Sequence, residues 1–256
     1  TGSHYDRQTL HLIRASEQEG FISPGETKLL ESTTGSSGAS FAWMAKVLGY
    51  QAVIVIPEDM PAARIEQIRS YGAEIIFSPK GRYVKGLIST FRRVAAQNRD
   101  YFPLNHSADE VHSPAAMKEL GKEIISDFQR SGLDRPDYFV AALGNGISAR
   151  GIGEALQEVG TAIYGMEPYE SPTVLYHFFR DKYRKKYDSE TLNADSHIII
   201  GTGPGEQEFP NMERIGDQIL EIFLPKTDDV MSMRDRLMFE ELQLVGNSSA
   251  ACIWSA

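Results

Sequence analysis

Short apolar runs alternate with helical patterns along much of the sequence, and this alternation most constrains the fold. Residues 52–56 read Ala-Val-Ile-Val-Ile, a continuous apolar run typical of a strand buried on both faces of a parallel sheet. Further strands are expected at residues 28–31, 74–77, 138–142 and 162–165, and helices at 6–19, 39–48, 61–71, 83–98 and 114–130. Strands and helices that alternate at this spacing predict parallel β/α units and an α/β fold.

The charge and cysteine content exclude several classes of protein. The chain has 256 residues and a formal net charge of −9, which argues against a nucleic-acid-binding protein with its usual basic surface. No apolar run approaches the roughly 18 residues of a membrane span. A single cysteine, Cys252, excludes an internal disulfide framework and a cysteine-based metal cluster, and it predicts a reducing, cytoplasmic setting. We expect both ends to belong to a longer chain, because the sequence stops inside an expected apolar helix.

The first of two glycine-rich turns occupies residues 33–38, Thr-Thr-Gly-Ser-Ser-Gly, between an expected strand and an expected helix. Main-chain N–H groups at a helix start, together with four hydroxyl groups, make a binding site for an anion such as a carboxylate or a phosphate. An ordinary Ser/Gly turn with a helix cap is an equally good interpretation of these residues alone.

The second glycine-rich turn begins at Gly144 and reads Gly-Asn-Gly-Ile-Ser, again between a strand and a helix. Gly144 and Gly146 with Ala149 fit a loose dinucleotide fingerprint, which would indicate a nucleotide-binding oxidoreductase. The acidic residue expected about 20 positions later has only a poor match in Glu167, which Pro168 follows. A phosphate-binding turn outside a dinucleotide site is therefore the better interpretation, and an ordinary tight turn is the alternative.

Motifs that follow one another in the same order along the chain resemble the cysteine synthase and cystathionine β-synthase family. The quoted motifs are residues 20–38 (Gly-Phe-Ile-Ser-Pro-Gly-Glu-Thr-Lys-Leu-Leu-Glu-Ser-Thr-Thr-Gly-Ser-Ser-Gly), 48–50, 56–57, Met60, Arg64, 72–74, 144–148, 165–168, 197–203 and 246–251. This resemblance implies a fold-type-II enzyme that uses pyridoxal 5′-phosphate (PLP). It also implies two three-layer parallel-sheet domains of the tryptophan-synthase-β kind, at 5–110 and 111–256, with a cleft between them.

The resemblance assigns roles to residues of both turns. Thr33, Thr34, Ser36 and Ser37 correspond to the loop that binds the substrate carboxylate, and Asn105 and His106 lie near a family glutamine that does the same. Ser36 stands where the family has an asparagine that contacts the cofactor 3′-oxygen. We expect Asn105 to bind substrate, and we interpret His106 as a hydrogen-bonded polar residue rather than a catalyst.

The phosphate cup of the family corresponds to Gly144, Asn145, Gly146, Ile147 and Ser148. The family form is Gly-Thr-Gly-Gly-Thr, so Ile147 replaces a glycine and is expected to bring a side chain towards the phosphate. Ser248 corresponds to the serine on the pyridine nitrogen. A neutral hydroxyl there suits β-elimination and β-replacement.

The largest departure from the family lies at the N-terminal end. The family carries Ser-x-Lys-Asp-Arg, whose lysine forms the Schiff base with PLP, whereas this sequence reads Ser-His-Tyr-Asp-Arg at residues 3–7. Tyr5 therefore stands at the lysine position. Residues 2–4 also fit the remnant of a purification tag, but the match on both sides of Tyr5 favours the family register.

A phenol cannot form an imine, so PLP would bind without a covalent bond to this residue, or as an imine already formed with an amino acid. Tyr5 could act as a base only with a pKa below its ordinary value of about 10, and His4, with a reference pKa of about 6.5, could assist. The alternatives are that Tyr5 packs in a retired active site or that it was engineered.

Two hypotheses follow. In the first, the chain is a PLP-dependent lyase or transferase that acts on a small amino acid of the O-acetylserine, serine or cysteine type, with an altered lysine role. In the second, it is a non-catalytic homologue that binds PLP, an amino acid or a partner protein. We expect a homodimer and no metal. The tyrosine-rich segment 175–195 resembles an insertion that forms a lid, a dimer contact or a surface helix.

Overall fold

The computed structural model describes residues 1–203 and 209–256, and the chain divides into two compact units. Unit 1 is Thr1–Ala116 and unit 2 is Met117–Ala256. The expected division after residue 110 lies just before the helix α5 (His112–Arg130), which contains the observed division. No helix in these two stretches is long and apolar enough to span a bilayer.

Unit 1 is built from four β/α repeats. Its elements in chain order are α1 (Tyr5–Gln18), β1 (Lys28–Ser32), α2 (Ser36–Val47), β2 (Gln51–Pro57), α3 (Ala62–Ser70), β3 (Glu74–Ser78), α4 (Tyr83–Gln97), β4 (Tyr101–Pro103) and the short 3-10 helix η1 (His106–Ala108). All four strands are parallel, in the order β3-β2-β1-β4. The predicted α/β fold with parallel sheets is confirmed.

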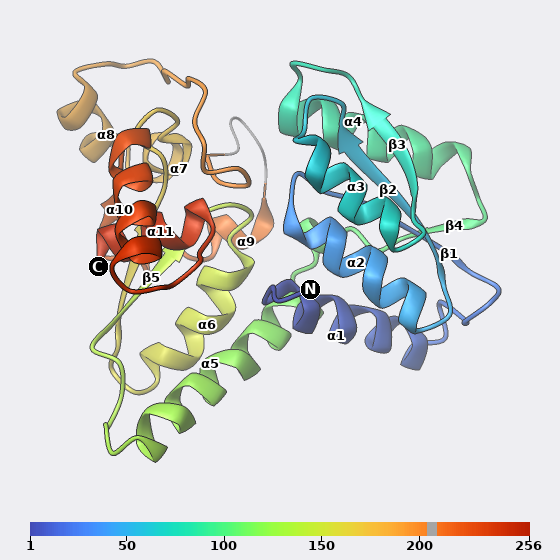
Figure 1. The fold of residues 1–256 in the computed structure, drawn as a ribbon, viewed down its shortest axis with the longest axis horizontal. Helices are drawn as coiled ribbons and strands as arrows, with labels where there is room; N and C mark the ends of the chain where they lie inside the picture. Colours follow the sequence, from blue (N-terminus) through green and yellow to red (C-terminus); the bar gives the residue numbers. More distant parts are fainter. Residues whose placement is uncertain (204–208) are drawn as a thin grey trace. The chain divides into compact units, whose positions relative to one another are not determined.

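Successive side chains of each strand point to opposite faces, so the apolar side chains of this sheet are divided between its two faces. Val53 and Val55 of β2 pack against α4, in a cluster that includes Phe91. Ile54 and Ile56 point to the opposite face and pack in the larger cluster formed with α1, α2 and α3. Figure 1 shows α2 and α3 on one side of the sheet and α4 on the other. The continuous apolar run thus reflects a strand covered on both faces, as predicted.

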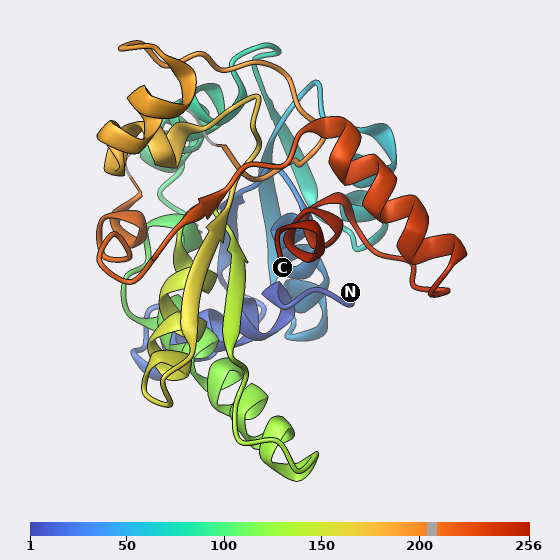
Figure 2. The ribbon, with the colours of Figure 1, turned by 90° about the vertical axis from the view of Figure 1, so that its left-hand side faces the viewer.

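Unit 2 has a smaller parallel sheet in the order β5-β6-β7. After α5, its elements are β5 (Tyr138–Ala142), α6 (Ile147–Gln157), β6 (Ala162–Met166), α7 (Thr173–Phe178), α8 (Arg180–Tyr187), α9 (Pro210–Glu213), β7 (Ile222–Phe223), α10 (Thr227–Phe239) and α11 (Asn247–Ser255). Met166 of β6 packs in a cluster with α10 and α11, and Figure 2 shows α11 next to the strands with α10 on its outer side. Ile163 of the same strand lies next to Gly153 of α6.

The tyrosine-rich insertion forms α7 and α8 and packs through its rings. The centroids of Tyr176 and Tyr183 lie 4.9 Å apart, those of Tyr183 and Tyr187 lie 4.8 Å apart, and Tyr187 continues the series to Tyr169. Tyr183 is fully buried, whereas most of the charged residues of α8 are exposed.

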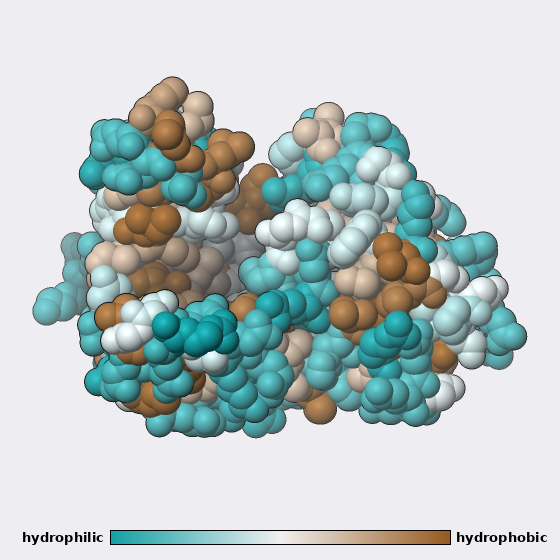
Figure 3. Space-filling model, turned by 60° about the horizontal axis from the view of Figure 1, so that its bottom comes forward, coloured by the Kyte–Doolittle hydropathy of each residue, from teal (hydrophilic) through white to brown (hydrophobic). Residues whose placement is uncertain are grey.

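On the molecular face drawn in Figure 3, hydrophilic side chains predominate and apolar ones form separate patches.

Candidate functional site

The sheet of unit 1 reverses its winding between β1 and β4. The chain leaves β1 for α2 on one face, and it reaches β4 from α4 on the other face. In open α/β sheets, ligands bind outside the carboxyl ends of the strands at such a switch point. The loops that follow β1 and β4 carry the predicted substrate residues, so the fold brings residues 33–37 and 105–106 to the same edge.

Thr33 organises the first glycine-rich turn from within. Its Oγ1 accepts hydrogen bonds from the N–H groups of Gly35 (2.9 Å) and Gly38 (3.0 Å) and shares a third bond with the Ser37 hydroxyl (2.8 Å). Gly38 has no room for a side chain, because a Cβ atom there would lie 2.3 Å from Cγ2 of Thr33. The Thr33 hydroxyl is therefore used inside the turn, where it holds the start of α2.

Thr34 and Ser36 present the accessible hydroxyl groups of this turn. Thr34 is half-buried and Ser36 is exposed at the first residue of α2. Arg64 of α3 donates from Nη1 to the Thr34 carbonyl at 3.1 Å, which places a positive charge beside the turn. A helix start, two hydroxyls and a neighbouring guanidinium suit a carboxylate ligand. Arg64 belongs to the motifs that resemble the family, but no local pattern around it predicts this contact, because the two residues are 30 positions apart.

Tyr5 begins α1, and His4 immediately precedes it. The Tyr5 ring stacks on His4 with centroids 4.5 Å apart and meets His106 edge-on at 6.0 Å. Burial raises the pKa of Tyr5, so the phenol stays protonated at neutral pH. Desolvation lowers the pKa of His4, with a smaller opposing effect from Asp6. The shift at Tyr5 is opposite to the one that a tyrosine base requires.

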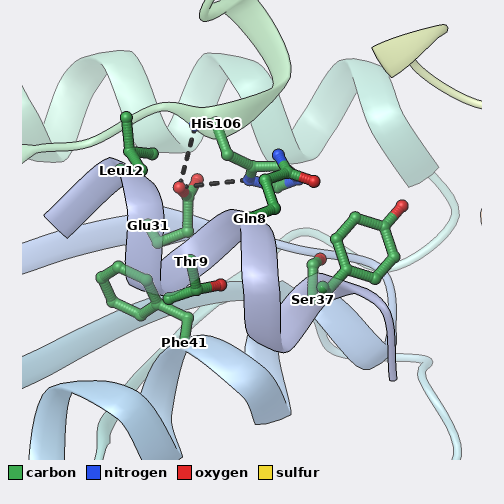
Figure 4. A pocket seen from close by; sticks show the side chains of 8 residues that line it. Gln8, Thr9, Leu12, Glu31, Ser37, Phe41 and His106 are labelled. Atoms are coloured by element: carbon green, nitrogen blue, oxygen red, sulfur yellow. Dashed lines mark hydrogen bonds and ion pairs between the residues drawn. The ribbon is translucent and has the colours of Figure 1, made fainter. Parts of the chain in front are cut away.

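A small cavity with both polar and apolar side chains in its lining lies beside Tyr5. Figure 4 shows its lining residues, which are Tyr5, Gln8, Thr9, Leu12, Glu31, Ser37, Phe41 and His106. Its volume is about 10 Å³, enough for about one water molecule. Four of these residues come from one face of α1, with the spacing i, i+3, i+4 and i+7. This helical spacing is the sequence signal that places Gln8 on the same face as Tyr5.

A buried carboxylate holds His106 in this cavity. Glu31, only 1% exposed, accepts at Oε2 from the main-chain N–H of His106 (2.9 Å) and pairs there with its Nδ1 (3.1 Å). The other oxygen of Glu31 accepts from the N–H of Ser32 at 2.7 Å. Asn105 turns the chain with a left-handed φ of 48°, which asparagine tolerates better than most residues. The interpretation of His106 as a bonded polar residue omitted Glu31, although a glutamate in an apolar strand is itself a signal.

The second glycine-rich turn joins β5 to α6 in unit 2 and requires its glycines. A Cβ atom on Gly144 would lie 2.3 Å from the Gly201 carbonyl oxygen. Gly146 has a φ of +85°, and a Cβ atom there would lie 2.8 Å from the Met212 nitrogen. The turn therefore brings bare main chain to the start of an 11-residue helix, an arrangement suited to a phosphate group.

The side chains of this turn differ from the expectation at one position. Ile147 is 1% exposed, so its side chain packs in the interior rather than beside the phosphate-binding main chain. Its N–H donates to Oδ1 of Asn145 at 3.2 Å. This burial at the first residue of α6 argues against the expected crowding of the phosphate. Ser148, in the same helical turn, is half-buried.

Ser248 lies in the first turn of α11, also in unit 2, and is half-buried. The preceding residue fixes this turn, because Nδ2 of Asn247 donates to the Ile198 carbonyl at 2.9 Å and its Oδ1 accepts from Arg234 at 3.2 Å. Residues 197–203 and 246–251, which the sequence identified as separate motifs, therefore meet through Asn247.

The residues fit PLP at its phosphate group but not at its aldehyde. At Gly144 and Gly146 the space of a side chain is occupied by the Gly201 carbonyl and the Met212 main chain, so the fit to the phosphate rests on the main-chain N–H groups that begin α6. The four lysines of unit 1, which is described throughout, are Lys28, Lys46, Lys80 and Lys85, and none of them lines the cavity beside Tyr5. Within residues 1–203 and 209–256, no group of three or more metal-binding side chains is clustered.

Comparisons with known proteins agree with this geometry. A probable cysteine synthase of Bacillus subtilis is 29% identical over 262 residues, covering 100% of this chain and 76% of that protein. A cysteine synthase of Staphylococcus aureus is also 29% identical and 76% covered, and cysteine synthase 3 of Caenorhabditis elegans is 30% identical and 68% covered.

Solved structures of related enzymes have the same fold. A hydrogen sulfide-producing enzyme from Fusobacterium nucleatum superposes with a TM-score of 0.81 at 27% identity, over 97% of this chain and 76% of that one. O-ureido-L-serine synthase gives a TM-score of 0.84 over 100% of this chain and 74% of that one, and at 24% identity it supports the fold alone. The model of the pyridoxal-phosphate dependent enzyme family matches residues 1–256. The chain belongs to that family, its relatives are cysteine synthases, and its cofactor is pyridoxal phosphate.

Proposed function

We propose that the chain binds PLP without a covalent bond to lysine and catalyses β-elimination or β-replacement on a small amino acid of the O-acetylserine, serine or cysteine type. The cofactor, when bound, supplies a conjugated ring that withdraws electrons from a bond at the substrate α-carbon. The names of the relatives support this substrate class, since they are cysteine synthases.

Different residues of the chain are assigned to the cofactor and to the substrate. We assign the cofactor phosphate to the main chain of residues 144–148 and the ring nitrogen to the neutral hydroxyl of Ser248. We assign the substrate carboxylate to Thr34 and Ser36, with the Arg64 guanidinium nearby, and retain Asn105 as a predicted contact. Thr33 and Ser37 support the loop through their shared hydrogen bond.

The observation that carries the proposal is the buried Gln8 amide in the cavity beside Tyr5. A retired site is free to fill with apolar side chains, because buried polar groups without partners are destabilising. Here Gln8 is 1% exposed, and neither its amide oxygen nor its amide nitrogen has a hydrogen-bond partner. Such groups are maintained where a ligand or an ordered water completes their bonding.

The second candidate function is a binding protein without turnover. Tyr5 favours it, because a protonated phenol at the lysine position can neither form an imine nor remove a proton at neutral pH. The same cofactor and substrate sites would then serve for recognition of PLP, an amino acid or a partner protein.

Titration with PLP followed by addition of L-cysteine or O-acetylserine separates these candidates. The proposal predicts a saturable change in the cofactor absorbance, a second change on addition of the amino acid, and release of sulfide or pyruvate or formation of a new amino acid. Binding without product supports the second candidate, whereas the absence of PLP binding contradicts the proposed enzyme and leaves the second candidate only as a protein that binds an amino acid or a partner protein. The expected homodimer and cytoplasmic location stay predictions, which light scattering and cell fractionation would test.

A further inference from the structure

The cavity of unit 1 contains a pair of groups to which the substrate and cofactor assignments give no role. Glu31 and His106 come from β1 and from the turn after β4, and both are almost fully buried. Their side chains meet at 3.1 Å, between Oε2 of Glu31 and Nδ1 of His106. Ser37 of the carboxylate-binding turn and Tyr5 line the same cavity, so the pair lies where the substrate is expected.

The carboxylate fixes the protonation pattern of the imidazole. Oε2 of Glu31 accepts the main-chain N–H of His106 and also lies next to Nδ1 of its ring. Since a carboxylate oxygen can only accept, the proton of the neutral ring is placed on Nδ1. Nε2 is then left as an acceptor, with the Ser107 hydroxyl at 3.4 Å. A carboxylate behind a histidine in this way orients the ring and stabilises the imidazolium that forms when Nε2 takes a proton.

Gln8 supplies the remaining part of the arrangement. Gln8 lines the same cavity as His106, and both of its amide atoms are buried without a partner. The cavity has room for about one water molecule, and a water there gains from polar groups that lack other partners. The Tyr5 ring meets His106 edge-on and limits rotation of the imidazole.

We propose that His106, oriented by Glu31, is the acid–base residue of this site, and that Gln8 holds the water through which it exchanges protons with the substrate. The inference rests on the proposed function. The C–H bond at the substrate α-carbon breaks and its electron pair stays on the substrate. The water takes that proton as it gives one of its own to Nε2, and the imidazolium charge is balanced by Glu31. The reverse transfer returns the proton.

Among the side chains that line the cavity, His106 is the one suited to act as a base, because the others are uncharged, protonated or already hydrogen-bonded. Tyr5 from α1 and Glu31 from β1 are the other titratable side chains in the lining, and α2 contributes Ser37 and Phe41, which carry no charge. Glu31 has its two oxygens occupied by donors, and Tyr5 remains a neutral hydrogen-bond donor. This arrangement gives the proton-transfer role to a histidine where the family pattern has a lysine.

The first test reads the tautomer of His106 directly, without turnover. In full-length protein labelled with ¹⁵N-histidine, with and without PLP, we expect long-range ¹H–¹⁵N NMR spectra of the neutral His106 ring to show Nδ1 protonated and Nε2 free. We expect Glu31→Gln to convert this to a mixture of tautomers, whereas Glu66→Gln, on an exposed side chain of the same unit, leaves it unchanged. A wild-type ring protonated at Nε2 would overturn the proposal.

The second test measures exchange of the α-proton of L-cysteine in D₂O, with PLP binding measured in the same samples. We expect His106→Ala and the bulkier His106→Gln to lower the exchange rate at least 100-fold while PLP stays bound. Added imidazole restores the rate in His106→Ala, which a purely structural role would not allow. The control His11→Ala removes an exposed histidine of α1 and leaves the rate within twofold.

The outcomes separate this inference from the proposed function. Exchange that persists in both His106 variants, or that is absent from wild-type protein with PLP bound, overturns the role of His106 while the cofactor site stands. Failure of wild-type protein to bind PLP overturns the proposed function itself, and with it the proton transfer that rests on it.

Discussion

The two glycine-rich turns use different parts of the chain for binding. In unit 2 the turn at residues 144–148 offers main-chain groups. Its two glycines are required because a side chain at Gly144 or Gly146 would collide with the carbonyl of Gly201 or the main chain around Met212. In unit 1 the corresponding edge offers side chains, namely the hydroxyls of the turn and the cavity around Tyr5. A site made of main chain survives side-chain replacement, whereas one made of side chains changes its chemistry with each replacement.

Buried carboxylates show the same difference. Glu167 of unit 2 is fully buried and accepts from the N–H groups of Val174 (2.9 Å) and Leu175 (2.7 Å), which holds the start of α7. Glu31 of unit 1 instead binds the titratable ring of His106. The first carboxylate serves the architecture, and the second is coupled to a group that can move a proton.

The largest predicted effect concerns the pH dependence of stability through Glu167. Burial raises the pKa of Glu167 from 4.5 to about 8, against the opposing effect of its main-chain hydrogen bonds. The folded state therefore keeps a proton that the unfolded chain releases. This contribution to stability is complete below about pH 4.5 and is lost as the pH rises through about 8, and it converts to roughly 5 kcal/mol at most.

Urea unfolding of wild-type protein and Glu167→Gln between pH 5 and 8 checks this assignment. We expect the free energy of unfolding of the wild type to fall with pH relative to the variant. Parallel curves for the two proteins would mean that the main-chain donors keep Glu167 ionised, and that it caps α7 as a charge.

The next largest effect on the free energy of unfolding is expected for Ile147→Gly, which introduces the residue of the family pattern. Because Ile147 is buried in the core, we expect Ile147→Gly to lower the free energy of unfolding by about 4 kcal/mol, through the lost packing and the flexibility of glycine in a helix. Ile147→Val is the matched control, with an expected loss of about 1 kcal/mol. Unchanged stability with tighter PLP binding would restore the idea that Ile147 crowds the phosphate.

Gly146→Ala tests whether the cofactor cradle depends on bare main chain. The positive φ and the approach to Met212 predict a loss of about 3 kcal/mol in the free energy of unfolding, together with at least tenfold weaker PLP binding. Gly216→Ala, in the same unit, meets no atom within 4 Å and is expected to have little effect on either quantity. Equal behaviour of the two variants would show that residues 144–148 tolerate side chains.

Glu31→Gln gives the smallest effect on stability. The amide keeps the shape of the side chain but loses one acceptor position among three donors, so we expect a loss of about 2 kcal/mol. Glu66→Gln, an exposed partner of Arg69, should change stability by less than about 0.5 kcal/mol. A variant of Glu31 as stable as the wild type would indicate that His106 does not depend on the carboxylate.

The sequence predicted the strands and helices between residues 5 and 130 other than β4 and η1 because their signals are local, but it did not predict the 13-residue helix α10. The apolar run of β2, for example, lies within five consecutive residues, 52–56. Strands β4 and β7 were missed, since they have three and two residues, and Pro103 argues against a strand. β4 accepts this proline because it lies at the edge of the sheet.

The glycine-rich turns of the site were predictable for the same reason, whereas the pair in the cavity was not. Glu31 and His106 are 75 positions apart, and only the pairing of β1 with β4, in the register Leu30 to Pro103, brings them together. No local pattern at residue 106 records that pairing. The direction of the pKa shift of Tyr5 likewise depends on burial, which the helix start alone does not reveal.

Borohydride reduction of the PLP-saturated protein, followed by intact mass measurement of wild type and Tyr5→Lys side by side, tests the central claim most directly. The account predicts that wild-type protein binds PLP and gains no covalent phosphopyridoxyl group, because no lysine of unit 1 lines the cavity. It predicts that Tyr5→Lys gains one such group, at residue 5. A wild-type protein that gains this mass at a lysine would contradict the account, and that lysine would then have the role that the family gives to position 5.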